Sequence, residues 1–142
     1  MSDYEHVTTD AAVATYETAI EVFKALLKEV RELSKKKPDA TLSANKVKLV
    51  NAVLTDILTF LENEPEGKYL SPLEDEELPQ VSDALMMMVQ FEAGLAAFNK
   101  RYRKYISYGA FDGEHHWITE EQLATWNDAD AEFEEEDDQD GS

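Results

Sequence analysis

Two adjacent histidines beside carboxylates are the grouping in this chain that most resembles a set of metal ligands. His115 and His116 lie in the run Glu114-His115-His116-Trp117, close to Asp112. Imidazole and carboxylate groups both bind divalent metal ions. Adjacent residues of a helix or strand point in different directions, however, and a helical ligand pair is usually spaced i, i+4. We therefore expect a loop with one histidine bonded to backbone and the other in water, and no metal or cofactor.

Other catalytic signals are missing from the sequence. The chain has 31 Asp and Glu residues and no cysteine, which excludes disulfides, thiol catalysis and cysteine-ligated zinc. No nucleophile elbow, P-loop, HEXXH motif or dinucleotide fingerprint is present. With so many carboxylates some pair lies close by chance, whereas acid–base catalysis also needs a concave pocket and shifted pKa values. We predict that the protein is not an enzyme.

The negative charge is unevenly distributed along the 142 residues. The formal net charge is −18. Residues 112–142 hold thirteen acidic residues and no Lys or Arg, whereas residues 1–111 hold eighteen acidic and thirteen basic residues, a net charge of −5. Such a surface repels nucleic acid and membrane phosphates and attracts basic partners over about a Debye length. We therefore expect a protein partner with a basic surface, and no direct contact with nucleic acid or membrane.

Two carboxylate-rich segments are the candidate partner-binding sites. One is the segment from Thr119 to Asp140, where aromatic side chains could enter a partner's pocket while acids complement its basic rim. The other is an acidic run in the connection that follows the second predicted helix. The candidate residues are Glu74, Asp75, Glu76, Glu77, Glu120, Glu121, Trp126, Asp128, Asp130, Glu132, Phe133, Glu134, Glu135 and Glu136.

The acidic tail has other interpretations. Leu123 and Trp126 could pack onto the body of the protein, because a tryptophan has a large apolar area to bury, and the tail would then only keep the protein soluble. Alternatively, the tail could fold back on the basic runs Lys35–Lys37 or Lys100–Lys104, in a weak, salt-sensitive contact. The sequence leaves these alternatives open.

A basic stretch with interleaved tyrosines, Lys100-Arg101-Tyr102-Arg103-Lys104-Tyr105, could bind phosphates and stack bases. However, Tyr102 and Tyr105 fall on the buried positions of a helical repeat. Cations at a helix C-terminus are also stabilised by the helix dipole. We expect a solvated helix end here.

The elements that would position these residues are helices. Three segments repeat apolar residues at alternating spacings of three and four, typical of a helix that buries one face. The repeats comprise Val13, Tyr16, Ile20, Phe23, Leu27 and Val30; Val47, Val50, Leu54, Ile57 and Leu61; and Ala84, Met88, Phe91, Leu95, Phe98, Tyr102 and Tyr105. In the Met86-Met87-Met88 run, Met88 falls in the core register and Met86 outside it.

Capping signals and breaks set the helix ends. Ser43 is a good N-cap, and Thr119 with Gln122 forms a capping box. The short connection from Pro38 to Leu42 predicts that the first two helices are antiparallel neighbours. Glycines break the pattern after residue 107, and no strand-like alternation is long enough to predict a sheet. We predict helices over about 10–36, 43–63, 79–107 and 119–127.

The predicted fold is all-α: an antiparallel three-helix bundle with a short fourth C-terminal helix and a disordered acidic tail. Residues 1–127 form the bundle domain and residues 128–142 the tail. The longest apolar run, Ala84 to Val89, is far shorter than the ~20 residues of a membrane span. Residues 1–10 carry no secretory signal pattern, so we expect a cytoplasmic protein.

The leading hypothesis is a non-enzymatic acidic binding protein that engages a basic surface of another protein. In its most concrete form it is an inhibitor that occupies a nucleic-acid-binding site, presenting carboxylates in place of phosphates. Small acidic helical proteins of this kind are common among phage and mobile-element products, which is an analogy only. The alternative is a helical structural or assembly subunit, or chaperone, that packs bundle faces against copies of itself or a larger machine. Leu26 and Leu33 make this plausible because they widen the apolar stripe of the first helix.

Overall fold

The computed structural model describes residues 6–108 and 111–128. These residues are mostly helical, with one small two-stranded sheet. The chain divides into a helical unit, Ala14–Asn99, and a terminal unit formed by described residues of 1–13 and 100–142. We describe each unit by itself.

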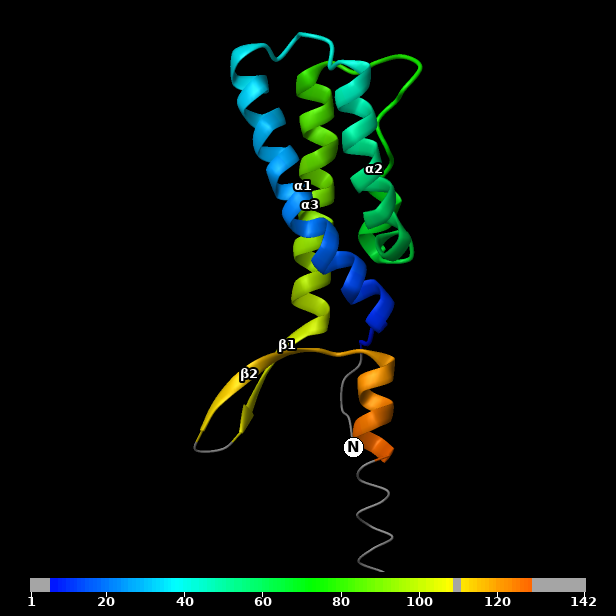
Figure 1. Cartoon of the computed structure of the whole chain (residues 1–142), viewed down its shortest axis with the longest axis vertical. Coiled ribbons are helices and arrows are strands. Elements are labelled where there is room, and N and C mark those ends of the chain that lie inside the picture. Colours follow the sequence, from blue (N-terminus) through cyan, green and yellow to red (C-terminus); the bar gives the residue numbers. More distant parts are fainter. Residues whose placement is uncertain (1–5, 109–110, 129–142) are drawn as a thin grey trace, which may run out of the picture. The chain divides into compact units, whose positions relative to one another are not determined.

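Three long helices make up the helical unit (Figure 1). They are α1 (Asp10–Lys36), α2 (Ala44–Leu61) and α3 (Val81–Tyr102), and a short 3-10 helix, η1 (Pro65–Tyr69), follows α2. The first residues of α1 and the last residues of α3 belong to the terminal unit. Ser43 caps α2, its side chain accepting a hydrogen bond from the Lys46 backbone N–H at 3.3 Å. The N-cap predicted from the sequence is therefore confirmed.

The predicted apolar repeats supply the core of the helical unit. Its buried residues include Phe23, Leu27 and Val30 on α1, Val47, Val50, Leu54, Ile57 and Leu61 on α2, and Ala84, Met88, Phe91, Leu95 and Phe98 on α3. At one end of this core the rings of Tyr16, Phe60 and Phe98 pack with centroids 4.9–6.2 Å apart. Met88 is buried and Met86 is 68% exposed, as the repeat predicts.

The helix directions differ in part from the prediction. Helices α1 and α2 are antiparallel, because Tyr16 near the start of α1 meets Phe60 at the end of α2. Helices α2 and α3 instead run in the same direction. Their beginnings are linked by a hydrogen bond from Leu42 N–H to Pro79 O at 2.9 Å, and their later turns by the Phe60–Phe98 contact. The physical reason is the long 62–80 connection, which returns along α2 before α3 begins (Figure 1).

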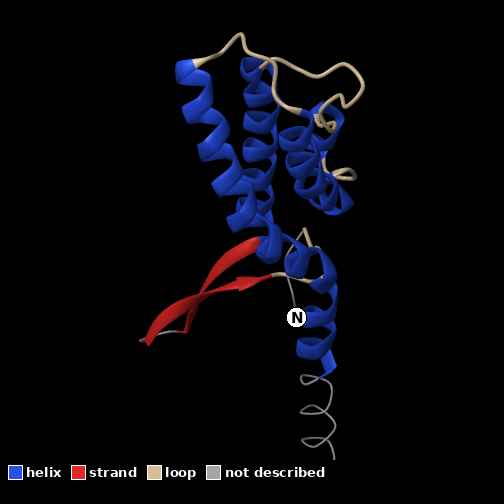
Figure 2. Ribbon diagram, turned by 45° about the horizontal axis from the view of Figure 1, so that its top comes forward, coloured by secondary structure: helices blue, strands red, loops and turns tan. Residues whose placement is uncertain are grey.

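The chain of the terminal unit leaves the helical conformation earlier than predicted. Helix α3 ends at Tyr102 instead of near residue 107, and the residues that follow form a β-hairpin (Figure 2). Strand β1 (Arg103–Tyr108) pairs antiparallel with β2 (Phe111–Trp117), with Arg103 opposite Trp117 and Tyr105 opposite His115. The expectation of no sheet was therefore wrong. Aromatic and β-branched residues favour strands, and strand pairing satisfies backbone groups across the hairpin.

A short helix at residues 120–128 completes the described part of the terminal unit. Thr119, 2% exposed, accepts a hydrogen bond from Gln122 N–H on its Oγ1 at 3.1 Å. The N-cap role predicted for Thr119 is thus confirmed. Thr8 forms an isolated parallel bridge with Thr119, and Glu121 Oε2 accepts a hydrogen bond from Asp10 N–H at 2.8 Å. The carboxylate thereby satisfies one of the unpaired amides at the start of α1.

Within residues 6–108 and 111–128, α3 is long and apolar enough to cross a membrane by length and composition. Core helices of soluble proteins pass the same test. Here Ala84, Met88, Phe91, Leu95 and Phe98 lie buried in the helical unit.

Candidate functional surfaces

The acidic loop, Glu74–Glu77, presents four consecutive carboxylates to solvent. All four residues are exposed. Within the part of the chain that the structure describes, none of the four carboxylates forms an ion pair. Their charge is therefore available to a partner, and the loop keeps the place that the sequence predicts for it, between α2 and α3.

This loop is fixed to the helical unit at both ends. On its N-terminal side Leu73 is buried, and its backbone N–H and C=O pair with the Asn51 side chain at 2.8 and 2.9 Å. On its C-terminal side Gln80 forms an antiparallel bridge with Thr41, and Val81 N–H donates to Ala40 O at 2.8 Å. The carboxylates thus project from an anchored segment of chain.

The terminal helix carries the other described candidates. Glu120, Glu121 and Asp128 are exposed on residues 120–128. Trp126 is half-buried and its ring lies 6.4 Å from that of His116, in an edge-on arrangement. The sequence left open whether this tryptophan docks on a partner or packs locally, and the ring contact favours local packing.

The remaining candidates lie outside the described residues. They are Asp130, Glu132, Phe133, Glu134, Glu135 and Glu136. The same holds for the proposed return of the tail onto Lys35–Lys37 or Lys100–Lys104.

The histidine pair lies on strand β2 and not in a loop as expected. The two rings have separate neighbours: His115 contacts the Tyr105 ring at 5.2 Å, and His116 contacts Trp126. The His116 Nε2 lies 3.7 Å from a Glu114 carboxylate oxygen. Among the described residues no group of three or more His, Asp and Glu side chains is placed to hold a metal ion.

The basic stretch also differs from its predicted form. Tyr102 is buried as expected, but Tyr105 is 57% exposed, because it stands on β1 and no longer on a helical core position. Its hydroxyl accepts a hydrogen bond from Gly113 N–H at 2.8 Å, which fixes the ring across the hairpin. The cations Arg103 and Lys104 therefore lie on a strand, but the Lys104 ammonium still donates to the Lys100 carbonyl in the last turn of α3 at 3.0 Å, where the helix dipole favours a cation.

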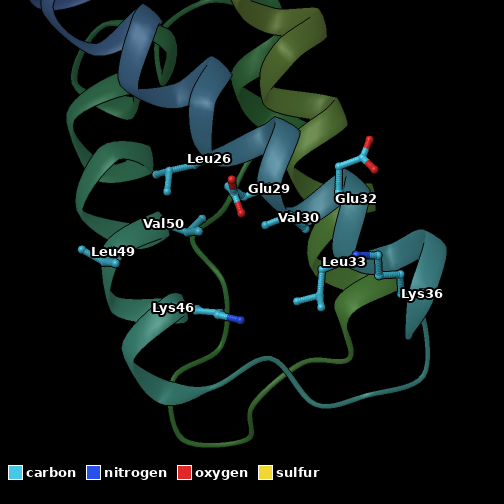
Figure 3. Close-up of a pocket in the computed structure, with 9 residues that line it drawn as sticks. All are labelled: Leu26, Glu29, Val30, Glu32, Leu33, Lys36, Lys46, Leu49 and Val50. Atoms are coloured by element: carbon cyan, nitrogen blue, oxygen red, sulfur yellow. The ribbon is translucent and has the colours of Figure 1, made fainter.

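The α1–α2 groove includes Leu26 and Leu33, the two residues that widen the apolar stripe of α1, but the groove itself was not predicted. It is an open hollow of about 330 Å³ in the helical unit (Figure 3). Its apolar lining comes from Leu26, Val30 and Leu33 on α1 and from Leu49 and Val50 on α2. Leu49 is 61% exposed. On α2 the signal in the sequence was Leu49, an apolar residue outside the heptad that runs through Val47, Val50 and Leu54.

Charged residues border this groove. Lys36 and Lys46 stand at the end where α1 finishes and α2 begins, and Glu29 and Glu32 stand further back along α1 (Figure 3). A hydrogen bond from the Lys35 ammonium to Glu32, at 3.1 Å, lowers the pKa of that carboxyl below its ordinary value. Among the described residues Glu29, Lys36 and Lys46 form no ion pair, although the positive charge of Lys36 also favours the ionised carboxylate of Glu32.

No family model matches the chain, and neither a curated protein nor a solved structure matches it significantly.

Proposed function

We propose that the protein is a non-enzymatic acidic binding protein that engages a basic surface of another protein. The fold would be a three-helix bundle with a fourth C-terminal helix and an acidic tail. The observation that carries the proposal is the anchored acidic loop, in which Glu74–Glu77 are exposed between fixed ends. A loop that is already ordered loses less conformational entropy on binding.

A nucleic-acid-binding site is the proposed target of this loop. Such sites present Lys and Arg to the phosphates of nucleic acid, and successive carboxylates offer similar charge. The body of the protein has only a small net charge, −5 over residues 1–111. This favours recognition by a local acidic segment over mimicry by the whole surface. Glu120, Glu121 and Asp128, with the acids beyond residue 128, would form a second segment.

The test is a matched pair of charge-neutralised proteins. One carries Glu74→Gln, Asp75→Asn, Glu76→Gln and Glu77→Gln. The control loses the same number of charges from dispersed exposed positions, by Glu17→Gln, Glu21→Gln, Asp39→Asn and Glu62→Gln. Each protein is used to capture partners from an extract of the native host at low and high salt, with elution by short duplex DNA. We expect the loop variant to lose the DNA-displaceable partner and the control to keep it. Equal capture of the partner by both variants would exclude the acidic loop as the partner-binding site.

Two further variants separate charge from loop order and from the tail. Asn51→Ala removes both hydrogen bonds to Leu73 but leaves all four carboxylates in place. If the fixed loop matters, this variant binds the captured partner more weakly with an unchanged salt dependence. Deletion of residues 128–142 measures how much the tail contributes to the affinity for the partner. A tail contact with a basic surface weakens as salt rises, so its removal should also reduce the salt dependence of binding.

The second candidate function is that of a helical structural or assembly subunit, or chaperone, that acts through a bundle face. The α1–α2 groove favours it, because Leu49 is well exposed beside an apolar hollow. Clusters of exposed apolar residues in an otherwise polar surface mark interaction sites. Its test is sedimentation of the purified protein at micromolar concentration, in which a monomer throughout would exclude the homo-oligomeric form.

A further inference from the structure

The apolar lining of the α1–α2 groove extends beyond the hollow itself. Val22, one turn before Leu26 on α1, is 50% exposed, and residues four apart lie on the same helix face. Together with Leu33 this gives an apolar stripe along α1, and Leu49 runs beside it on α2. The area is larger than an isolated surface leucine would create, and its burial would be favourable.

The charges that border the groove narrow the choice of occupant. The cations Lys36 and Lys46 stand at one end, and the uncompensated carboxylate of Glu29 stands two helical turns away from Lys36. A uniformly basic partner would meet the lysines, and a uniformly acidic one would meet Glu29 and Glu32. A fitting surface carries apolar residues between a positive and a negative end.

The chain itself carries such a surface. If a second copy of α1 lies antiparallel to the first, centred between Glu32 and Leu33, Lys36 and Glu29 lie equally far from the centre on its two sides. Each Lys36 then faces Glu29 of the other copy, and the pair occurs twice because a two-fold interface uses the same patch on both copies. The two Leu33 side chains meet between these pairs, and each Leu26 lies level with the 38–42 turn of the other copy.

We propose that the α1–α2 groove is the interface of a symmetric homodimer in which the α1 helices of two copies pack antiparallel about Leu33. This proposal rests on the second candidate function and names its partner as a second copy of the chain. It is independent of the acidic loop. The dimer therefore forms in purified protein, whatever Glu74–Glu77 do.

The first test is sedimentation velocity over a range of micromolar concentrations with Leu49→Gln and the matched control Met86→Gln. Both residues are strongly exposed apolar side chains on helices, and Met86 lies on α3, outside the groove lining. We expect a concentration-dependent dimer of the wild type, a dissociation constant raised at least tenfold in Leu49→Gln, and no change in Met86→Gln. A wild type that stays monomeric, or equal behaviour of the two variants, overturns the proposal.

The second test exchanges the charges. Lys36→Glu alone and Glu29→Lys alone each place like charges opposite one another in the dimer, and each should weaken it. The double variant restores opposite charges and should recover the wild-type dissociation constant. Because the two residues are seven positions apart on one helix, recovery arises between copies and not within one. A double variant that is no better than the single variants overturns the two-fold arrangement.

Salt separates this proposal from the one on acidic binding. Two chains of net charge −18 repel each other, and salt screens both that repulsion and the two Lys36–Glu29 pairs. Exposed ion pairs contribute little to the binding free energy, so the loss of repulsion is the larger effect. The homodimer should therefore hold or tighten as salt rises, whereas binding of a basic partner by the acidic loop should weaken. A dimer that dissociates when salt is raised counts against the apolar groove as its basis.

Discussion

Single ionisable residues show how local contacts set the charge of the groove. Glu32 Oε1 accepts a hydrogen bond from the Lys35 ammonium, and this bond and the positive charges of Lys35, Lys36 and Lys28 favour the ionised carboxylate. The pKa of Glu32 is therefore lowered. The pair stabilises the folded state above the ordinary pKa of glutamate, and this contribution is lost as the pH falls through the lowered value.

We predict that Lys35→Gln raises the pKa of Glu32 back toward its ordinary value. The measurement is a side-chain carboxyl titration by NMR, with Lys37→Gln as the control, since Lys37 is not among the causes of the shift. Lys37→Gln should leave the titration of Glu32 nearly unchanged. An equal effect of both substitutions would show that the general positive charge, and not the hydrogen bond, sets the pKa.

For single residues, the sequence predicted which side chains are buried better than it predicted their hydrogen-bond partners. Met88 is buried and Met86 exposed because the helical repeat decides which residue faces the core. The repeat could not show that Asn51 would hold Leu73, or that Glu121 would accept a hydrogen bond from Asp10. These partners are 22 and 111 residues apart, so only the folded chain brings them together.

Among the elements, the β-hairpin is where sequence and structure differ most. The apolar repeat predicted for the third helix extends to Tyr105. In the structure, however, residues 103–108 pair with residues 111–117 as strands. This strand pairing requires a glycine at position 113. A Cβ at Gly113 would collide with backbone atoms of Ile106 and Ser107 on the facing strand.

We therefore predict that Gly113→Ala distorts the hairpin while leaving the helical unit intact. The Tyr105 hydroxyl would lose its bond to the Gly113 amide, since the two strands must move apart. Amide hydrogen exchange and cross-strand NOEs measured by NMR would report the change, with Glu114→Ala, an exposed neighbour, as control. Unchanged cross-strand NOEs in Gly113→Ala would contradict this account of the pairing.

For the molecule as a whole, stability comes from the buried repeats and binding from the surfaces that they leave uncovered. Leu54 and Leu49 represent these two roles on one helix: Leu54 is 0% exposed and Leu49 is 61% exposed. Truncation of a buried leucine loses apolar contacts and leaves a cavity, whereas an exposed leucine has few contacts to lose.

We predict that Leu54→Ala lowers the free energy of unfolding by about 2–5 kcal/mol. Leu49→Ala should change it by no more than about 0.5 kcal/mol. Chemical denaturation at a concentration where the protein is monomeric gives both values. A large cost for Leu49→Ala under these conditions would mean that Leu49 supports the fold, and it would remove the argument for a free groove.

The sequence by itself determined the helical character of the chain, most of the core residues of the three long helices, the caps at Ser43 and Thr119, and the exposed acidic run Glu74–Glu77. These follow from local spacing and residue type, which act within a few turns of helix. Tertiary structure alone decided that α2 and α3 are parallel, that Tyr105 and the histidines stand on a hairpin, and that Leu49 borders an open groove. Each of these depends on contacts between distant segments, and no local pattern encodes which segments meet.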